Sequence, residues 1–187
     1  MDPRVTRTRR DVLAAAREVL LADGWEHVTV SRVAERSGYA RTTLYRHWPQ
    51  RLDLLRDLLA EEARLAHTMP TGDLRADLIA ELEAFREAIV SSALGQVIIA
   101  IGQQARHDAE VADLNRSMRA DGAHVLEEIV TDGRRSGRLA PDVQVDLALA
   151  QLVGPVLFQY LFADPRALDY GFVESVVDRF LATSGAP

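Results

Sequence analysis

The sequence predicts an all-α protein with an N-terminal three-helix domain and a C-terminal helical bundle. Apolar residues recur at the helical spacing i, i+3, i+4 and i+7 along almost all of the 187 residues, and we find no convincing strand. Gly and Pro fall between these periodic runs, where helices are expected to end. The chain has no cysteine, which excludes both a disulfide framework and a thiolate metal site.

The first helix is expected from about Thr6 to Gly24. Its apolar residues follow one another at i, i+4, i+7 and i+8. They are Val12, Ala16, Val19 and Leu20. The basic start of the chain is like that of a secretion signal, but charged residues, among them Asp11 and Glu18, interrupt the apolar run that such a signal needs. We therefore expect a cytoplasmic protein, and no membrane span, since no stretch approaches roughly 18 consecutive apolar residues.

Residues 29–55 predict a helix-turn-helix, in which a glycine-bearing turn joins two short helices. Thr29 can cap the first helix, and Gly38 stands where a left-handed residue would end it. Leu44 alone anchors the second helix inward, so the polar residues around it face outward. These outward residues are Tyr39, Arg41, Thr42, Thr43, Tyr45, Arg46 and His47. The arrangement is typical of modules that place the second helix in the major groove of DNA.

A longer helix follows, over about residues 51–67, with three leucines on its inner face. Pro70-Thr71-Gly72 then breaks the helical pattern. We place the domain boundary at this break. The prediction is an N-terminal domain of residues 6–66 and a C-terminal domain of residues 73–187.

The C-terminal domain is expected to consist of helices alone. Their ranges are about 74–90, 94–104, 110–136 and 145–162, followed by a last helix that includes 173–181. The helix at 145–162 is apolar over so much of its circumference that it must be covered on more than one side. Gly154-Pro155 falls in its middle, where the Pro should kink the helix and the Gly should permit a close backbone approach.

The charge of the chain is divided unevenly. The net charge is -6, although DNA favours a basic partner. Residues 1–52 hold ten Arg against six acidic residues, a net of +4, whereas residues 53–187 hold twelve against twenty-two, a net of -10. The positive charge is therefore concentrated on the helix-turn-helix.

The helix-turn-helix resembles the N-terminal domain of TetR-family transcriptional regulators. The matching residues are Thr29, Val33, Ala34, Ser37, Gly38, Tyr39, Arg41, Thr43, Leu44, Tyr45, His47, Trp48, Pro49, Arg51 and Leu54. The match extends back to about Thr6 and forward to about Ala66, and its Leu-Tyr-x-His-aromatic-Pro ending is specific. Tyr39, Gln50 and Leu52 depart from the usual pattern, which has a small aliphatic, a Ser or Asp, and an acidic residue at these positions.

The resemblance implies that the partner is a double-stranded DNA operator. Phosphate contacts are implied for Thr29, Tyr45, His47 and Arg51, and major-groove contacts for Tyr39, Arg41, Thr42 and Thr43. Arg41 could bond a guanine edge and the Thr methyl groups could meet thymine. The alternative is a solvated surface charge for Arg41 and a partly buried structural role for His47. Trp48 matches an aromatic core position of the family and is expected to pack.

The resemblance also implies a homodimer, because two helices from each of two subunits would make a four-helix interface. The interface residues expected on the last two helices are Leu149, Val153, Val156, Leu157, Val173, Val177 and Phe180. Two ordinary core helices of a monomer remain the alternative. A dimer would suit the task, since one short recognition helix reads few base pairs and two half-sites about 34 Å apart, or a multiple of that, add specificity.

The family further implies a small-molecule effector, held inside the C-terminal domain. The pocket residues expected are Val97, Ile98, Ile101 and Gln104, together with Phe158 and Phe162. Apolar walls with a few amide groups are typical of ligand sites, although the same run would serve as plain core. Since charges do not cluster there, the effector is expected to be apolar or amphipathic.

Signals for other chemistry are weak. His107-Asp108 with Glu110 lacks a second well-spaced pair of metal ligands and favours a solvated helix start, so we expect no metal site and no cofactor. We find no catalytic residues, because no nucleophile motif or phosphate loop is present. The prediction is a homodimeric repressor released by an effector. An activator, a regulator answering to a protein partner, a helical enzyme and a protein-interaction module remain alternatives.

Overall fold

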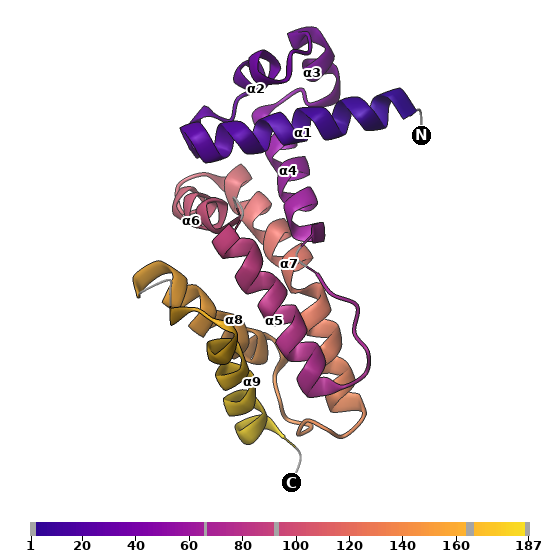
Figure 1. Ribbon diagram of the computed structural model, residues 1–187, viewed down its shortest axis with the longest axis vertical. Helices are drawn as coiled ribbons and strands as arrows, with labels where there is room; N and C mark the ends of the chain where they lie inside the picture. Colours follow the sequence, from indigo (N-terminus) through magenta and orange to yellow (C-terminus); the bar gives the residue numbers. More distant parts are fainter. Residues whose placement is uncertain (1–2, 66, 92–93, 164–166, 186–187) are drawn as a thin grey trace. The chain divides into compact units, whose positions relative to one another are not determined.

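The computed structural model describes residues 3–65, 67–91, 94–163 and 167–185 (Figure 1). All secondary-structure elements of several residues in these ranges are helices, which confirms the all-α fold. The helices are α1 (Pro3–Asp23), the 3₁₀ turn η1 (Trp25–His27), α2 (Val30–Ser37), α3 (Arg41–His47), α4 (Arg51–Leu65), α5 (Leu74–Ser91), α6 (Leu94–Gln104), α7 (Ala109–Arg135), α8 (Val145–Phe162) and α9 (Tyr170–Ser184). Among the described residues, an isolated bridge joins Leu139 to Gly185.

The chain forms two compact units. The N-terminal unit comprises Met1–Arg64 with Ala93–Met118, and the C-terminal unit comprises Leu65–Ser92 with Arg119–Pro187. In these compact units, α6 and the start of α7 group with the N-terminal helices, and the expected domains of residues 6–66 and 73–187 stay a prediction. The reason is packing, since apolar side chains of α6 and α7 share one buried cluster with α1 and α4.

The N-terminal core is built from the apolar stripes of its helices. The expected stripe of α1 is buried, and α4 meets it with four leucines. The buried residues of these helices are Val12, Leu13, Ala15, Ala16, Val19, Leu20, Leu54, Leu55, Leu58 and Leu59. Removing one such leucine side chain costs about 2–5 kcal/mol, so this cluster is the main source of stability of the unit.

The turn between α2 and α3 follows its residues closely. Thr29 is extended, and its side chain accepts a hydrogen bond from the Arg32 amide at 3.2 Å, which caps α2. Gly38 ends α2 with φ of 74°, a left-handed conformation that costs little only for glycine. Both expectations are confirmed, and together they fix the angle at which the chain enters α3.

In the C-terminal unit, α5, α8 and α9 pack against one another (Figure 1). Their buried residues include Leu78, Leu82, Ile89, Leu152, Val156, Val173, Val177 and Phe180. The helix α8 continues through Gly154 and Pro155. A Cβ at Gly154 would meet no atom within 4 Å, so the close approach expected there does not occur within the chain.

Hydrogen bonds hold the segment before α5 in place. The buried carboxylate of Asp77 accepts from the Thr71 amide and hydroxyl and from the Gly72 amide, each at 2.8 Å. Burial alone would raise the pKa of Asp77, but these hydrogen bonds and the charge of Arg138 outweigh it and lower the pKa. Arg138 also donates to the Gly72 carbonyl, which ties the end of α7 to the same segment.

The length and composition of α8 would suffice to cross a bilayer, and only 17% of its residues are buried. The apolar run of α8 is interrupted, as the sequence indicates, but its mean hydropathy over 18 residues is 1.5. Asp146, Gln151 and Gln159 lie within it. One such helix is weak evidence for a span, because the core helix of a soluble protein can have the same length and composition.

Candidate nucleic-acid interface

The helix α3 is held to its unit by one side chain. Leu44 is fully buried, whereas Arg41, Thr42, Tyr45 and Arg46 are exposed. A helix of seven residues cannot persist alone, so the contacts of Leu44 and the capped turn before it must supply its stability. The consequence is a short helix with a polar face turned to solvent, as the sequence predicted.

Arg41 lies at the first turn of α3 and forms an ion pair with Glu35 on α2. Both side chains are more than half exposed, at 58% and 54%. Exposed pairs of this kind contribute about 0–1 kcal/mol, so the guanidinium can exchange Glu35 for another acceptor at little cost. Thr42 is exposed and Thr43 half-buried beside it.

Tyr39 is tied to the first helix. Its hydroxyl donates to Asp11 Oδ2 at 3.1 Å, and its half-buried ring packs against the core cluster. The expected major-groove contact of Tyr39 stays a prediction. Its observed role is to fix the segment that leads into α3 against α1, and sequence reasoning missed this role because Asp11 is 28 residues away.

Two of the residues expected to contact phosphates, Thr29 and Tyr45, have a hydroxyl hydrogen that they can donate. The Thr29 hydroxyl accepts from Arg32 in the cap of α2, which leaves its own hydrogen available as a donor. Tyr45 is 48% exposed. Both side chains can therefore donate to DNA without breaking a hydrogen bond described above.

The end of α3 is packed around Trp48. This residue is 2% exposed, and its indole Nε1 donates to Asp57 Oδ2 at 2.6 Å, which confirms the expected packing role. The His47 ring is half-buried, with its centroid 5.6 Å from that of Trp48. His47 thus combines a packed ring face with partial access to solvent, and its phosphate contact stays a prediction.

Arg51 has a structural role that the sequence did not indicate. Its Nε donates to the Val28 carbonyl at 2.9 Å and its Nη2 to the Trp25 carbonyl at 2.6 Å, while the guanidinium lies 5.0 Å from the Trp25 ring centroid. Burial lowers the pKa of Arg51, against the opposing charge of Glu26. The expected phosphate contact stays a prediction, and any such contact has to be made with these two hydrogen bonds in place.

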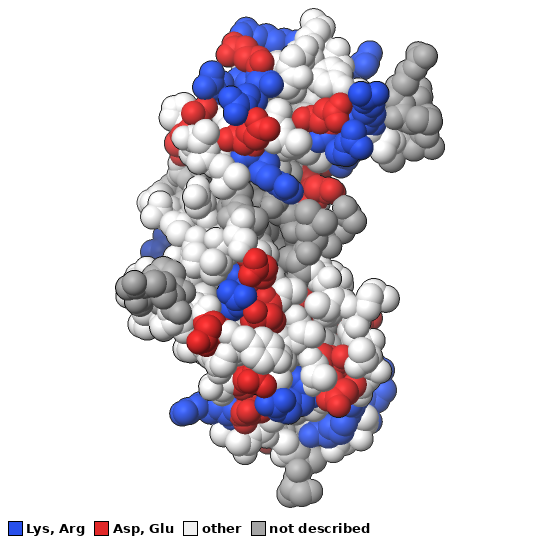
Figure 2. Space-filling model, viewed as in Figure 1, with Lys and Arg blue, Asp and Glu red and all other residues white. Residues whose placement is uncertain are grey.

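The surface of the N-terminal unit carries both signs of charge. Figure 2 shows arginines interleaved with carboxylates over these helices on the face in view. Arg32 pairs with Asp23 at 2.9 Å, and Arg36 with Glu18 at 2.7 Å. Both pairs lie within residues 1–52, so the net charge of +4 remains, although these arginines are engaged with carboxylates.

The residues expected to hold an effector are divided between the two units. Val97 and Ile101 are fully buried in the core of the N-terminal unit, and Ile98 is half-buried. Phe158 and Phe162 belong to the C-terminal unit and are 62% and 75% exposed, with ring centroids 5.4 Å apart. The effector site stays a prediction, and Val97 and Ile101 act in this structure as packed core.

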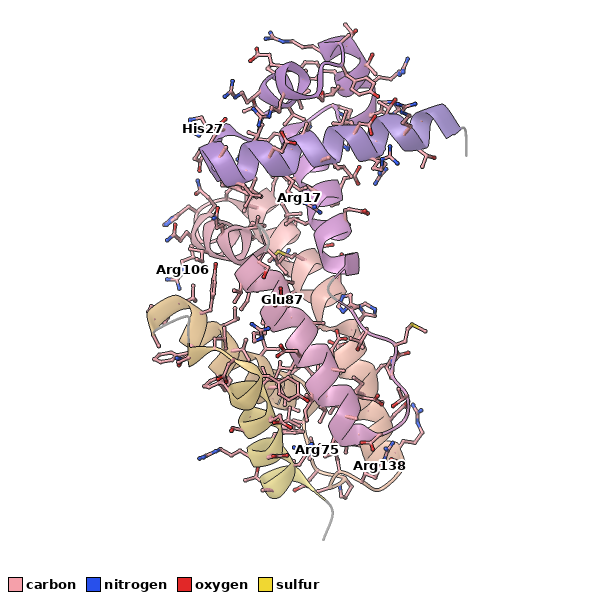
Figure 3. All side chains as sticks on the ribbon, in the orientation of Figure 1. Arg17, His27, Arg75, Glu87, Arg106 and Arg138 are labelled. Carbon is pink, nitrogen blue, oxygen red and sulfur yellow. The ribbon has the colours of Figure 1, made fainter. Side chains whose placement is uncertain are left out.

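Gln104, the remaining residue of that set, lines an open pocket of about 510 Å³ in the N-terminal unit. Its walls come from η1, the end of α1 and the end of α6, and its lining residues are Asp23, Gly24, Trp25, Glu26, His27, Ala100, Gln103, Gln104 and His107. Figure 3 labels His27 at its η1 side. The lining is more polar than the apolar wall that was expected for an effector.

The residues expected at a dimer interface fall into two groups. Val156, Val173, Val177 and Phe180 are buried within the C-terminal unit, so in this conformation they belong to the core of the subunit itself. The reason is that α9 packs on α5 and α8. The other three, Leu149, Val153 and Leu157, are half-buried on α8. The interface as a whole stays a prediction.

The segment His107-Asp108 lies directly before the start of α7. Among the residues that the structure describes, no three His, Asp or Glu side chains come together as possible metal ligands. Asp108 instead accepts hydrogen bonds from the amides of Glu110 and Val111, at 2.9 and 3.3 Å, and so caps α7. The segment is a helix start, as the sequence indicated.

A short helix fixed by one leucine, with arginine, threonine and tyrosine turned to solvent, defines a helix-turn-helix DNA-binding protein. The chain belongs to the TetR family of transcriptional regulators. The family model for bacterial regulatory proteins of the tetR family matches residues 12–58, and the model for the tetracyclin repressor-like C-terminal domain matches residues 68–180. The resemblance seen in the sequence is confirmed, and with it a function in DNA-binding transcriptional regulation.

Relatives match along most of the chain. The DNA-binding transcriptional repressor TetR of Mycobacteroides abscessus is 29% identical over 91% of this chain and 90% of its own. The HTH-type transcriptional repressor BepR of Brucella suis is 26% identical over 84% of this chain and 82% of its own. The crystal structure of the TetR family regulator SCO0332 superposes with a TM-score of 0.73 and is 34% identical, covering 93% of this chain and 96% of that one.

Proposed function

We propose that the protein is a transcriptional repressor that binds a palindromic operator as a homodimer and releases it when a small apolar or amphipathic molecule binds. The observation that carries the DNA-binding part is the polar, exposed face of α3, held to the unit by Leu44. Two relatives, from M. abscessus and B. suis, bear the name of repressor. We infer that the protein acts in the cytoplasm and has no enzymatic activity, as is typical of the family.

In this proposal, the side chains of α3 and its surroundings divide two tasks. Arg41, with the Thr42 and Thr43 methyl groups, reads base edges in the major groove, and Tyr39 lies beside them. The phosphate contacts come from Thr29, Tyr45, His47 and Arg51, and they position the helix without reading sequence. The exposure of Arg41 and its readily exchanged pairing with Glu35 support the first task.

Dimerisation supplies a second α3, which binds the second half-site of the operator. Exposed and half-buried apolar residues on α8 support a subunit contact there. They are Leu147, Leu149, Val153, Leu157, Phe158, Leu161 and Phe162. An apolar surface of this kind is costly in water and is typical of an interface. Two copies related by a two-fold axis would place two α3 helices one turn of DNA apart, or a multiple of it.

Release of the operator follows from thermodynamic linkage between the effector site and the DNA-binding site. An effector that binds one arrangement of the DNA-binding units more tightly than another shifts the population toward that arrangement by its difference in affinity. DNA must then weaken effector binding by the same factor. This reciprocity gives the effector a measurable signature before its identity is known.

The proposal is tested by mobility shift with the DNA that flanks the protein's own gene, repeated over a range of salt concentrations. We expect one palindromic fragment to be retained at low salt, with an affinity that falls steeply as salt rises. The variant Arg41→Ala should change the preference among fragments, and Tyr45→Phe should weaken all of them alike. Retention of no palindromic fragment at low salt would contradict the proposal.

A further inference from the structure

Two arginines lie together on the second turn of α1. Arg7 and Arg10 are three residues apart in the helix, so they share one face. Their side chains are 77% and 75% exposed. Arg7 Nε lies 3.8 Å from one oxygen of Asp11, and Arg10 Nη2 lies 3.2 Å from the other. One carboxylate thus faces two guanidinium groups, and the face keeps a positive excess.

Asp11 connects this basic face to the recognition helix. The same carboxylate accepts the hydrogen bond from the Tyr39 hydroxyl, and Tyr39 precedes the first residue of α3 by two positions. Arg7 and Arg10 are therefore linked, through Asp11 and the Tyr39 side chain, to the segment that leads into the N-terminal end of α3. In a helix-turn-helix, that end of the recognition helix reaches the base edges.

The orientation of α1 at this point is fixed from its other side as well. Arg9, which lies between the two exposed arginines in sequence, points to α4 and pairs with Asp57 at 2.8 Å. Asp57 in turn accepts the hydrogen bond from Trp48 at the end of α3. The second turn of α1 is thus tied to both ends of α3, through Tyr39 and through the Trp48–Asp57 pair.

We propose that Arg7 and Arg10 form a second DNA contact, which binds backbone phosphates beside the stretch of major groove that the N-terminal end of α3 enters. This inference rests on the proposed DNA-binding function. The ligand groups are guanidinium side chains, whose planar donors suit phosphate oxygens. Asp11 holds the two arginines when DNA is absent, and phosphates replace it on binding, because exposed ion pairs of this kind are weak.

There are two alternatives to this contact. If Arg7 and Arg10 are only solvated, replacing them leaves DNA binding unchanged. If they act only through general attraction between positive charge and DNA, replacing any other exposed arginines of the unit weakens DNA binding equally. Arg106 and Arg116 provide the comparison, since both are exposed and belong to the N-terminal unit. Figure 3 shows Arg106 beyond α6, on the side of the unit away from α3.

The experiment compares the double variant Arg7→Gln/Arg10→Gln with the matched control Arg106→Gln/Arg116→Gln, which loses the same charge. The probe is a duplex that the wild-type protein has selected from random-sequence DNA. For each protein, the logarithm of the association constant is measured against the logarithm of the salt concentration. Thermal unfolding of every variant verifies that the fold is kept.

We expect the slope of this plot to become less steep by ~3.6 in the Arg7→Gln/Arg10→Gln variant, which is ~0.9 for each of two contacts in each of two subunits. The control should keep the wild-type slope, and Arg7→Lys/Arg10→Lys should restore most of it. The preferred sequence should stay the same in all variants, because phosphate contacts do not read bases.

A second measurement locates the contact. Phosphates of the selected duplex are replaced one at a time by neutral methylphosphonates. Wild-type affinity should fall at a few positions at which the Arg7→Gln/Arg10→Gln variant is insensitive. If the wild type binds DNA but the variant and the control have equal slopes and equal phosphate profiles, the inference is overturned and the proposed function stands. If the wild type selects no DNA, the proposed function itself fails.

Discussion

Replacing Leu44 by alanine tests how α3 is held. Leu44 is fully buried, and the change removes three carbons from its side chain. At about 0.8 kcal/mol per buried CH₂, the lost transfer free energy is about 2.4 kcal/mol, and the cavity left behind brings the loss of unfolding free energy to about 3 kcal/mol. DNA affinity should fall with it, since the position of α3 depends on this contact.

The assay is urea unfolding followed by tryptophan fluorescence. The chain has two tryptophans, and both Trp25 and Trp48 are buried in the N-terminal unit, so the signal reports on this unit. With a slope of about 2 kcal/mol per molar urea, the loss corresponds to a midpoint lower by about 1.5 M. The control is Leu21→Ala, which truncates an exposed leucine on α1 and should change stability by less than about 0.5 kcal/mol. Equal midpoints for Leu44→Ala and the control would refute the argument that Leu44 anchors α3.

Three further predictions follow from individual side chains. Gly38→Ala should destabilise the N-terminal unit by about 1–2 kcal/mol, since φ is 74° there, and an unchanged urea midpoint would contradict this. Arg51→Gln should lower the stability of the same unit by about 1–3 kcal/mol, because the carbonyls of Trp25 and Val28 lose the guanidinium donors. A less steep salt dependence of DNA binding without a change in stability would contradict it. The pKa of Asp77 is lower in the folded protein than its ordinary value of 3.8, so its carboxylate contributes stability above that value and loses it as pH falls through the folded pKa. Acid unfolding followed by circular dichroism should therefore show the stabilities of the wild type and Asp77→Asn converging at low pH. A difference in stability that is constant with pH would refute the assignment.

Local rules predicted the helix-turn-helix well. A threonine cap, a left-handed glycine and a single inward leucine depend only on neighbours in the chain, and the structure has all three at Thr29, Gly38 and Leu44. Helix periods gave the range of α6 and of α8 to the residue. The family match depended on the same local pattern, and the comparisons confirmed it.

What the sequence could not give is the partner of each apolar or polar face. The stripe of Val173, Val177 and Phe180 is buried within its own unit, and its role at a subunit interface stays a prediction. Periodicity shows which face of a helix is apolar and not what covers that face. For the same reason, the sequence does not show that α6 packs with the N-terminal helices. Contacts over long sequence separations, such as Arg51 to Trp25 and Tyr39 to Asp11, have no local signal at all.

The central claim is that α3 reads a two-fold symmetric operator. The most direct measurement is selection from random-sequence DNA followed by sequencing of the bound pool, for the wild type and for Arg41→Ala. We predict a palindrome in the wild-type pool, with half-sites one helical turn or a multiple of it apart, and a changed base at one symmetric pair of positions in the Arg41→Ala pool. Enrichment of no palindrome, or an identical motif for both proteins, would contradict the claim.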